Sequence, residues 1–118
     1  MVSVAKVVSL RAGIHIRGLV LMVTIPAQPD APNAESRNKA VVVSWIIPAD
    51  GGAPISAQTV RTYRNGQLVS SLTVDGATSS TRVTRLRNGV YYTFTVQARN
   101  SMGAGLESTP SVSVRLAR

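Results

Sequence analysis

The fold is decided by the stretch Leu86-Arg87-Asn88-Gly89-Val90-Tyr91-Tyr92-Thr93-Phe94-Thr95-Val96-Gln97-Ala98. Within it, large apolar residues stand at every second position from Tyr92 to Ala98. Side chains alternate between the two faces of a strand, so this pattern predicts a strand with one buried face. The pair Asn88-Gly89 precedes the strand and is expected to supply the positive φ angles of a turn.

The same pattern recurs on both sides of this strand. Val41, Val43 and Trp45 alternate with Val42 and Ser44, as in a half-buried strand. Asn65-Gly66 predicts a type I′ hairpin between strands at 55–64 and 68–74. Further strands are expected at 81–86 and at the C-terminal end, where Val112, Val114 and Leu116 should face inward. No stretch has helical periodicity, so the sequence predicts an all-β, seven-stranded antiparallel β-sandwich.

Composition narrows the classes of function. The chain has 118 residues, which suits one domain with one core. It contains no cysteine and one histidine, so disulfide frameworks, thiolate zinc sites, cysteine nucleophiles and histidine-cluster metal sites are excluded. Thirteen Lys and Arg against five Asp and Glu give a net charge of +8, which favours anionic partners.

The composition changes near residue 26, where a proline-rich lead-in begins. We therefore expect an N-terminal arm at 1–25 and a sandwich domain at 26–118. Alternation in the arm predicts an extended, β-like segment that could add a strand to a neighbouring subunit, with an apolar side formed by Leu19, Leu21, Val23 and Ile25. Two alternatives stay open: a secretory leader, and an artefact of a misplaced start codon with Met22 as the true start. The apolar run is too short to span a membrane.

Residues 29–117 resemble a fibronectin type III domain of the kind found in bacterial and phage proteins. The matching pieces come in the family's order: the entry motif 29–32, the strand 40–45 with its tryptophan, the loop 48–55, the stretch 86–98 and the loop 100–108. The resemblance implies an immunoglobulin-like sandwich, in which the Tyr92 hydroxyl bonds backbone across a corner. The expected core residues are Trp45, Leu86, Tyr92 and Phe94.

Three features depart from the family pattern. Gln58 stands where the family has an inward tyrosine, which implies a polar core edge or a different register. The chain has no Arg-Gly-Asp tripeptide, so integrin binding through that motif is not implied. The arm at 1–25 lies outside the resemblance.

The sequence shows no active site. His15, the only histidine, alternates with Ile14 and Ile16 in the arm and is read as an ordinary β residue. Asp50 and Asp75 stand in turn contexts, so turn formation is the preferred interpretation over paired-carboxylate chemistry. We therefore expect a non-enzymatic protein without cofactor or metal.

Two arginine groups are candidate binding residues. If the buried strand faces are assigned correctly, a stripe on one open face should contain Arg61, Arg99 and Arg115. A second group near the corner before the central strand should contain Arg82, Arg85 and Arg87. Each group could dock an anionic polymer, a cell-surface glycan or an acidic protein, or could simply keep a solvated face soluble.

Nucleic acid is an unfavoured partner, because only Tyr63 and Tyr91 remain as candidate stacking aromatics outside the core. A single module with no second domain suits a small part of an oligomeric assembly. The favoured hypothesis is therefore a virion-associated protein, a phage capsid decoration or tail component. Its arm would dock on a neighbouring subunit while the sandwich projects from the virion surface. The alternative is an extracellular adhesion or spacer module of the bacterial cell surface, which could be associated with carbohydrate.

Overall fold

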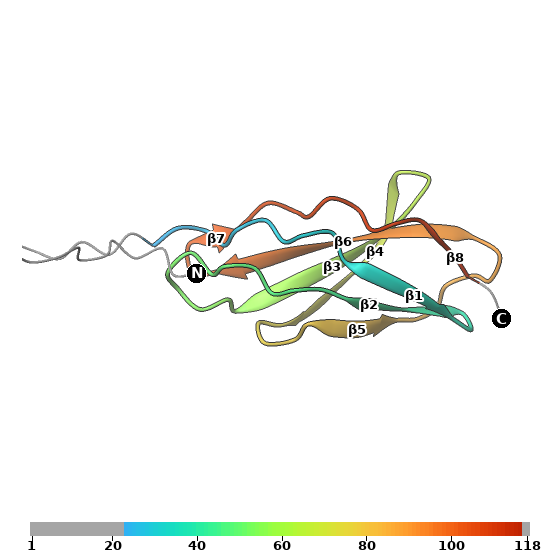
Figure 1. The fold of residues 1–118 in the computed structure, drawn as a ribbon, viewed down its shortest axis with the longest axis horizontal. Helices are drawn as coiled ribbons and strands as arrows, with labels where there is room; N and C mark the ends of the chain where they lie inside the picture. The colour runs from blue at the N-terminus through green and yellow to red at the C-terminus, as the bar shows by residue number, and fades with distance from the viewer. Residues whose placement is uncertain (1–22, 117–118) are drawn as a thin grey trace, which may run out of the picture.

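The computed structural model describes residues 23–116, which form two antiparallel sheets packed face to face (Figure 1). The strands are β1 (Asn33–Arg37), β2 (Ala40–Ser44), β3 (Ala57–Arg64), β4 (Gln67–Asp75), β5 (Ser80–Val83), β6 (Tyr91–Asn100), β7 (Gly103–Ala104) and β8 (Val114–Arg115). The described part of the chain has no helix long and apolar enough to cross a membrane.

One sheet has the order β1-β2-β5 and the other β4-β3-β6-β7, with β8 also paired to β6. Strands β7 and β8 pair with opposite ends of β6, so together they take the place of the single last strand that the sequence predicts. The all-β sandwich prediction is therefore confirmed. The Asn65-Gly66 hairpin is confirmed as well, with φ angles of 52° and 76° that fit a type I′ turn.

The core lies between the sheets and contains the four residues expected there. Trp45, Leu86, Tyr92 and Phe94 are all buried, and Val96 and Ala98 continue the inward face of β6. Burial of these side chains supplies the main stabilising term of so small a domain.

Gln58 resolves the departure from the family pattern. Its side chain is fully buried, and its Oε1 accepts a hydrogen bond of 2.8 Å from Nε1 of Trp45. Its Nε2 donates to the carbonyl oxygens of Gly76 (3.2 Å) and Thr78 (2.7 Å). A buried amide is tolerated when its polar atoms are paired, so the register is as predicted and the core has a polar edge.

The corner between β5 and β6 differs from the prediction in one respect. Gly89 has a φ of 85°, as expected, but the second positive φ belongs to Arg85 (63°) and not to Asn88. The Asn88 side chain accepts a hydrogen bond from the Lys39 backbone instead. The left-handed turn at Arg85 takes the chain out of the sheet, which is why β5 ends at Val83 and not at residue 86.

The prediction that Val112 faces inward is wrong: its side chain is 85% exposed. From Gly105 to Ser108 the chain advances three residues while its hydrogen-bond partners on β6 advance two, and the same happens from Ser108 to Ser111. Each extra residue shifts the alternation by one position. Ser111 therefore takes the buried position, and β8 is only two residues long.

Residues 23–32 approach the domain without forming a strand. Thr24 N–H donates to the Gly51 carbonyl (2.8 Å) and Ala27 N–H to the Ala49 carbonyl (2.9 Å). A Cβ added to Gly51 would lie 2.4 Å from the Thr24 carbonyl oxygen, so this approach requires glycine. Of the predicted arm residues, Val23 is half-buried and Ile25 is exposed, whereas Leu19 and Leu21 lie outside the described residues.

Candidate functional site

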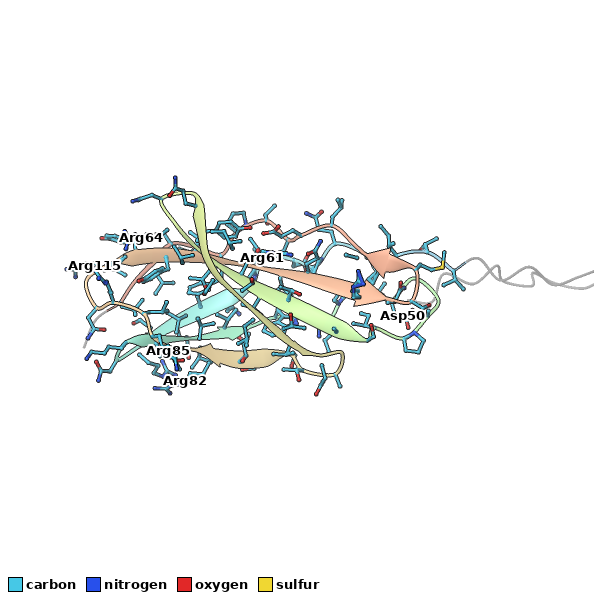
Figure 2. The ribbon with its side chains drawn as sticks, turned by 180° about the vertical axis from the view of Figure 1, so that it is seen from behind. Asp50, Arg61, Arg64, Arg82, Arg85 and Arg115 are labelled. Atoms are coloured by element: carbon cyan, nitrogen blue, oxygen red, sulfur yellow. The ribbon has the colours of Figure 1, made fainter. Side chains whose placement is uncertain are left out.

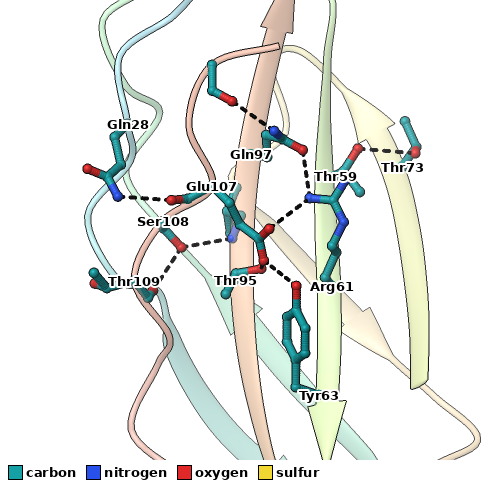
Figure 3. A network of polar contacts seen from close by, with 12 residues as sticks. Gln28, Thr59, Arg61, Tyr63, Thr73, Thr95, Gln97, Glu107, Ser108 and Thr109 are labelled. Atoms are coloured by element: carbon teal, nitrogen blue, oxygen red, sulfur yellow. Dashed lines mark hydrogen bonds and ion pairs between the residues drawn. The ribbon is translucent and has the colours of Figure 1, made fainter. Parts of the chain in front are cut away.

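A polar network centred on Glu107 lies on the outer face of the five-stranded sheet (Figure 3). Its carboxylate accepts hydrogen bonds from the hydroxyls of Tyr63 (2.5 Å) and Thr95. Arg61 Nη1 lies 3.6 Å from Glu107 Oε1 and donates to Gln97 Oε1 at 2.6 Å. The network joins β3 and β6 to the segment that follows β7.

The network perturbs two of its members. Burial acts to raise the pKa of Glu107, but the hydrogen bonds from Thr95 and Tyr63 and the charge of Arg61 outweigh it and lower that pKa below its ordinary value. The hydrogen bond to Glu107, helped by burial, raises the pKa of the Tyr63 hydroxyl above 10.0. At neutral pH the site is therefore a carboxylate held by two hydroxyls and one guanidinium.

This arrangement holds the polypeptide in place. Gln28 donates to the Glu107 carbonyl (2.9 Å) and Gln97 to the Gly105 carbonyl (2.8 Å), so the backbone is fixed as well as the side chain. The charge of Glu107 is balanced by Arg61. Among the described residues, no group of three or more His, Cys, Asp or Glu side chains could hold a metal ion.

Sequence reasoning missed this network. It treats Glu107 only as one of five acids and Tyr63 only as an outlying aromatic. The β3–β6 register places Arg61 beside Thr95 and Tyr63 beside Thr93, and no local pattern in the sequence reports that register.

Asp50 and Asp75 serve as turn residues, as predicted. Asp50 Oδ1 accepts from the Gly52 N–H, and Asp75 Oδ1 accepts from the Ala77 N–H, each at 2.9 Å. Their side chains therefore satisfy backbone donors in the loops.

The three arginines of the predicted stripe lie at separate positions along the length of β6. Arg115 pairs with Tyr91 at one end of that strand, Arg61 pairs with Thr95 in the middle, and Arg99 lies near the other end. Neighbouring members are four strand residues apart, or about 13 Å. Arg61 is half-buried in the Glu107 network, so the three charges do not act as one contiguous patch.

The second arginine group lies at one end of the sandwich. Arg82 and Arg85 are exposed there, with Arg64 and Arg115 at the same end, whereas Asp50 lies at the opposite end (Figure 2). Arg87 is exposed as well and lines the same hollow as Arg64 and Arg85. The β1–β2 turn, the β3–β4 turn and the paired ends of β6 and β8 meet at this end. We call it the basic end and define it by its cationic residues, which are Arg37, Lys39, Arg64, Arg82, Arg85, Arg87 and Arg115.

A third surface is the outer edge of β4. This strand pairs with β3 on one side and lies at the edge of its sheet. It has no charged residue before Asp75 and no proline. Leu68, Val69 and Leu72 are 53%, 49% and 38% exposed, respectively. Sequence reasoning assigned 68–74 to a strand but did not select these residues.

A fibronectin type III domain model matches residues 26–114. The chain belongs to the fibronectin type III domain family. Members of this family are typically non-enzymatic structural and binding modules.

Three relatives are larger than this chain, which matches part of each of them. The human protein "Cell adhesion molecule-related/down-regulated by oncogenes" is 33% identical over 91 residues, which are 74% of this chain and 7% of that protein. The FN1-FN3 domains of chicken CNTN1 match with a TM-score of 0.70 and 27% identity over 77% of this chain and 33% of theirs. The twitchin kinase region from C. elegans matches with a TM-score of 0.69 and 26% identity, over 79% of this chain and 17% of that one. The chain thus spans between 7% and 33% of the length of these three relatives.

Proposed function

We propose that this fibronectin type III module is a non-enzymatic attachment unit that joins protein subunits through the outer edge of β4. The observation that carries the proposal is that edge itself. It is nine residues long, and its exposed apolar side chains are accompanied by one charge, at the far end.

Such an edge is able to accept another strand. The backbone N–H and C=O groups on the outer side of an edge strand have no ladder partner, and natural proteins usually protect long edges with charges, prolines or bulges. Over its length β4 has one irregularity, between the pairs made by Thr62 and Tyr63. Main-chain pairing would supply affinity, and Leu68, Val69 and Leu72 would supply apolar contacts.

The proposed occupant is the N-terminal arm of a neighbouring copy. Residues 1–25 contain no acidic residue, and Leu19, Leu21, Val23 and Ile25 alternate at strand spacing. In the described chain Thr24 and Ala27 are bonded to the B–C loop, residues 48–55. Because these bonds hold Thr24 and Ala27 on their own domain, the residues before Thr24 are the part that would reach the neighbour.

The test measures the mass of the full chain in solution by light scattering across a concentration series. Leu68→Lys/Val69→Lys should shift the chain to monomer, because two ammonium groups oppose strand addition at that edge. The matched control is Ile46→Lys/Val112→Lys, which places the same charges on exposed apolar residues away from β4. A wild-type chain that is monomeric at every concentration would contradict self-assembly.

The arm is tested in the same way. Leu19→Asp/Leu21→Asp should abolish association, whereas Val20→Asp/Met22→Asp places equal charge on the alternate side of the predicted strand and should weaken it less. Equal loss in both pairs would mean that the arm contributes charge or solubility and not a register-specific strand.

The attachment could take place at a cell surface or on a virion. The human relative is named as a cell adhesion molecule-related protein, which supports an extracellular or cell-surface location for this module. The virion-surface role, with the module on a phage capsid or tail, remains a prediction that rests on the arm. Detection of the full-length chain in purified particles, or on the outside of intact cells, would separate the two settings.

A further inference from the structure

A hollow of about 340 Å³ lies at the basic end, between the start of β4 and the corner that joins β5 to β6. We call it the arginine hollow. Three arginines, Arg64, Arg85 and Arg87, line it together with apolar and aromatic residues that include Val69, Leu86 and Tyr92, of which Leu86 and Tyr92 are buried.

The guanidinium groups of Arg64, Arg85 and Arg87 have no carboxylate partner in the described part of the chain. The ion pairs recorded there join Arg37 to Glu35 and Arg61 to Glu107. Asp50 lies at the far end of the sandwich (Figure 2), and Asp75 ends β4 at that same far end. Like charges around one hollow repel each other, so a bound anion would lower the free energy of this region.

The corner that presents these arginines is held in place by its backbone. Arg85 adopts a left-handed φ of 63°, a conformation that costs free energy for a residue other than glycine. Leu86 N–H donates to the Lys39 carbonyl (3.1 Å), and Arg87 N–H donates to the Tyr92 hydroxyl (3.1 Å). The arginine backbones are therefore pre-positioned, which reduces the entropy lost when a ligand binds.

We propose that the arginine hollow binds an anionic sugar unit of a polysaccharide that carries sulfate or carboxylate groups. Guanidinium groups bind such oxygen anions through paired hydrogen bonds. Ser70 and Thr84, which also line the hollow, provide hydroxyls for the sugar hydroxyls, and Val69 provides an aliphatic surface for the ring. Arg82 and Arg115, at the same end, would meet neighbouring units of the polymer.

Two other polyanions fit the hollow less well. Single-stranded nucleic acids require aromatic surfaces for base stacking, and Tyr92, the aromatic residue that lines the hollow, is buried. An acidic peptide would satisfy the arginines but has no hydroxyl-rich ring to meet Ser70, Thr84 and Val69 together. The proposal does not depend on strand addition at β4.

The experiment measures binding of the full-length chain to immobilised dextran sulfate and to polygalacturonate, with neutral dextran as the blank. Arg87→Gln is compared with Arg99→Gln, which also removes an exposed charge but at the opposite end. We expect Arg87→Gln to weaken binding about tenfold, as for loss of one charged hydrogen bond, and Arg99→Gln to weaken it less than about twofold.

A triple variant sharpens the test. Arg64→Gln/Arg85→Asn/Arg87→Gln should reduce binding to the level of the dextran blank, and Asn tolerates the left-handed φ at position 85. Its thermal unfolding should match that of the wild type, which shows that the loss is not caused by misfolding.

Three results would overturn the proposal. Equal weakening by Arg87→Gln and Arg99→Gln would mean that net charge alone attracts the polymer. Poly-L-glutamate bound as tightly as the anionic polysaccharides would assign the hollow to an acidic protein. Oligothymidylate bound as tightly would assign it to nucleic acid.

Discussion

The two edges of the five-stranded sheet are built in opposite ways. At the β4 edge the ladder to β3 runs from Ala57 to Arg64 with one irregularity, and the strand's side chains are mostly exposed. At the other edge, residues 103–116 follow β6 with extra residues, and β7 and β8 are two residues long. One edge is a long strand with a single irregularity that is open to solvent, and the other is irregular along most of its length and is held by side-chain hydrogen bonds.

Side chains complete the irregular edge. Ser108 Oγ accepts from Val96 N–H (2.9 Å) and Ser111 Oγ accepts from Phe94 N–H (3.0 Å), so serine hydroxyls take the place of missing carbonyl partners. The Glu107 network then fixes the same segment to the outer face (Figure 3). This edge is therefore closed to further strands, which leaves β4 as the longer and more regular docking edge.

We expect the largest loss of stability from removal of a side chain in the core, on which both edges depend. Trp45→Ala should lower the free energy of unfolding by about 3–5 kcal/mol, because it leaves a cavity and removes the buried partner of Gln58. Urea denaturation measures this directly. A variant with nearly wild-type stability would show that the sheets are held together elsewhere.

The next largest loss of stability should occur at the irregular edge and not at the β4 edge. Ser111→Ala should cost about 1–3 kcal/mol, since it leaves the buried Phe94 N–H without its acceptor. Ser71→Ala on β4 is the matched control, and as an exposed change it should stay within about 0.5 kcal/mol. Comparable losses in the two variants would mean that the serine hydroxyls do not seal the irregular edge.

Acid should destabilise the irregular edge because it protonates the Glu107 carboxylate. The pKa of this carboxyl is lowered in the folded state, so its contribution is present above about pH 4.5, its ordinary value, and is lost as the pH falls through the lower folded pKa. Glu107→Gln should therefore be less stable than the wild type at pH 7, with a difference that shrinks toward pH 3. Melting temperatures across this range test the sign, and a constant difference would contradict it.

The smallest effect tests the shifted alternation. Val112→Lys should change the free energy of unfolding by less than about 0.5 kcal/mol, because the side chain is 85% exposed. If Val112 faced inward, as regular alternation predicts, burial of a lysine would unfold much of the domain. A urea midpoint equal to that of the wild type supports the irregular path.

Local patterns predicted the parts of the fold that obey regular geometry. Alternation along 92–98 and the Asn65-Gly66 turn were sufficient, since strand faces and tight turns depend on neighbouring residues. The same rule failed at Val112 and at Arg85, where extra residues and a left-handed corner are fixed by contacts with β6 and Lys39. The arginine groups could be selected from the sequence, but the partnership of Arg61 with Glu107 and the grouping of Arg64 with Arg85 depend on register.

The described chain enters the sandwich near the B–C loop, where Thr24 bonds Gly51, and leaves at the opposite end after β8 (Figure 1). A pulling force applied between residues 23 and 116 would therefore act along the strands. The hydrogen bonds between β6 and residues 103–116 would then be loaded in shear, many at once, and the serine hydroxyls would carry part of that load. The irregular edge would thus serve as the mechanical clamp of the module.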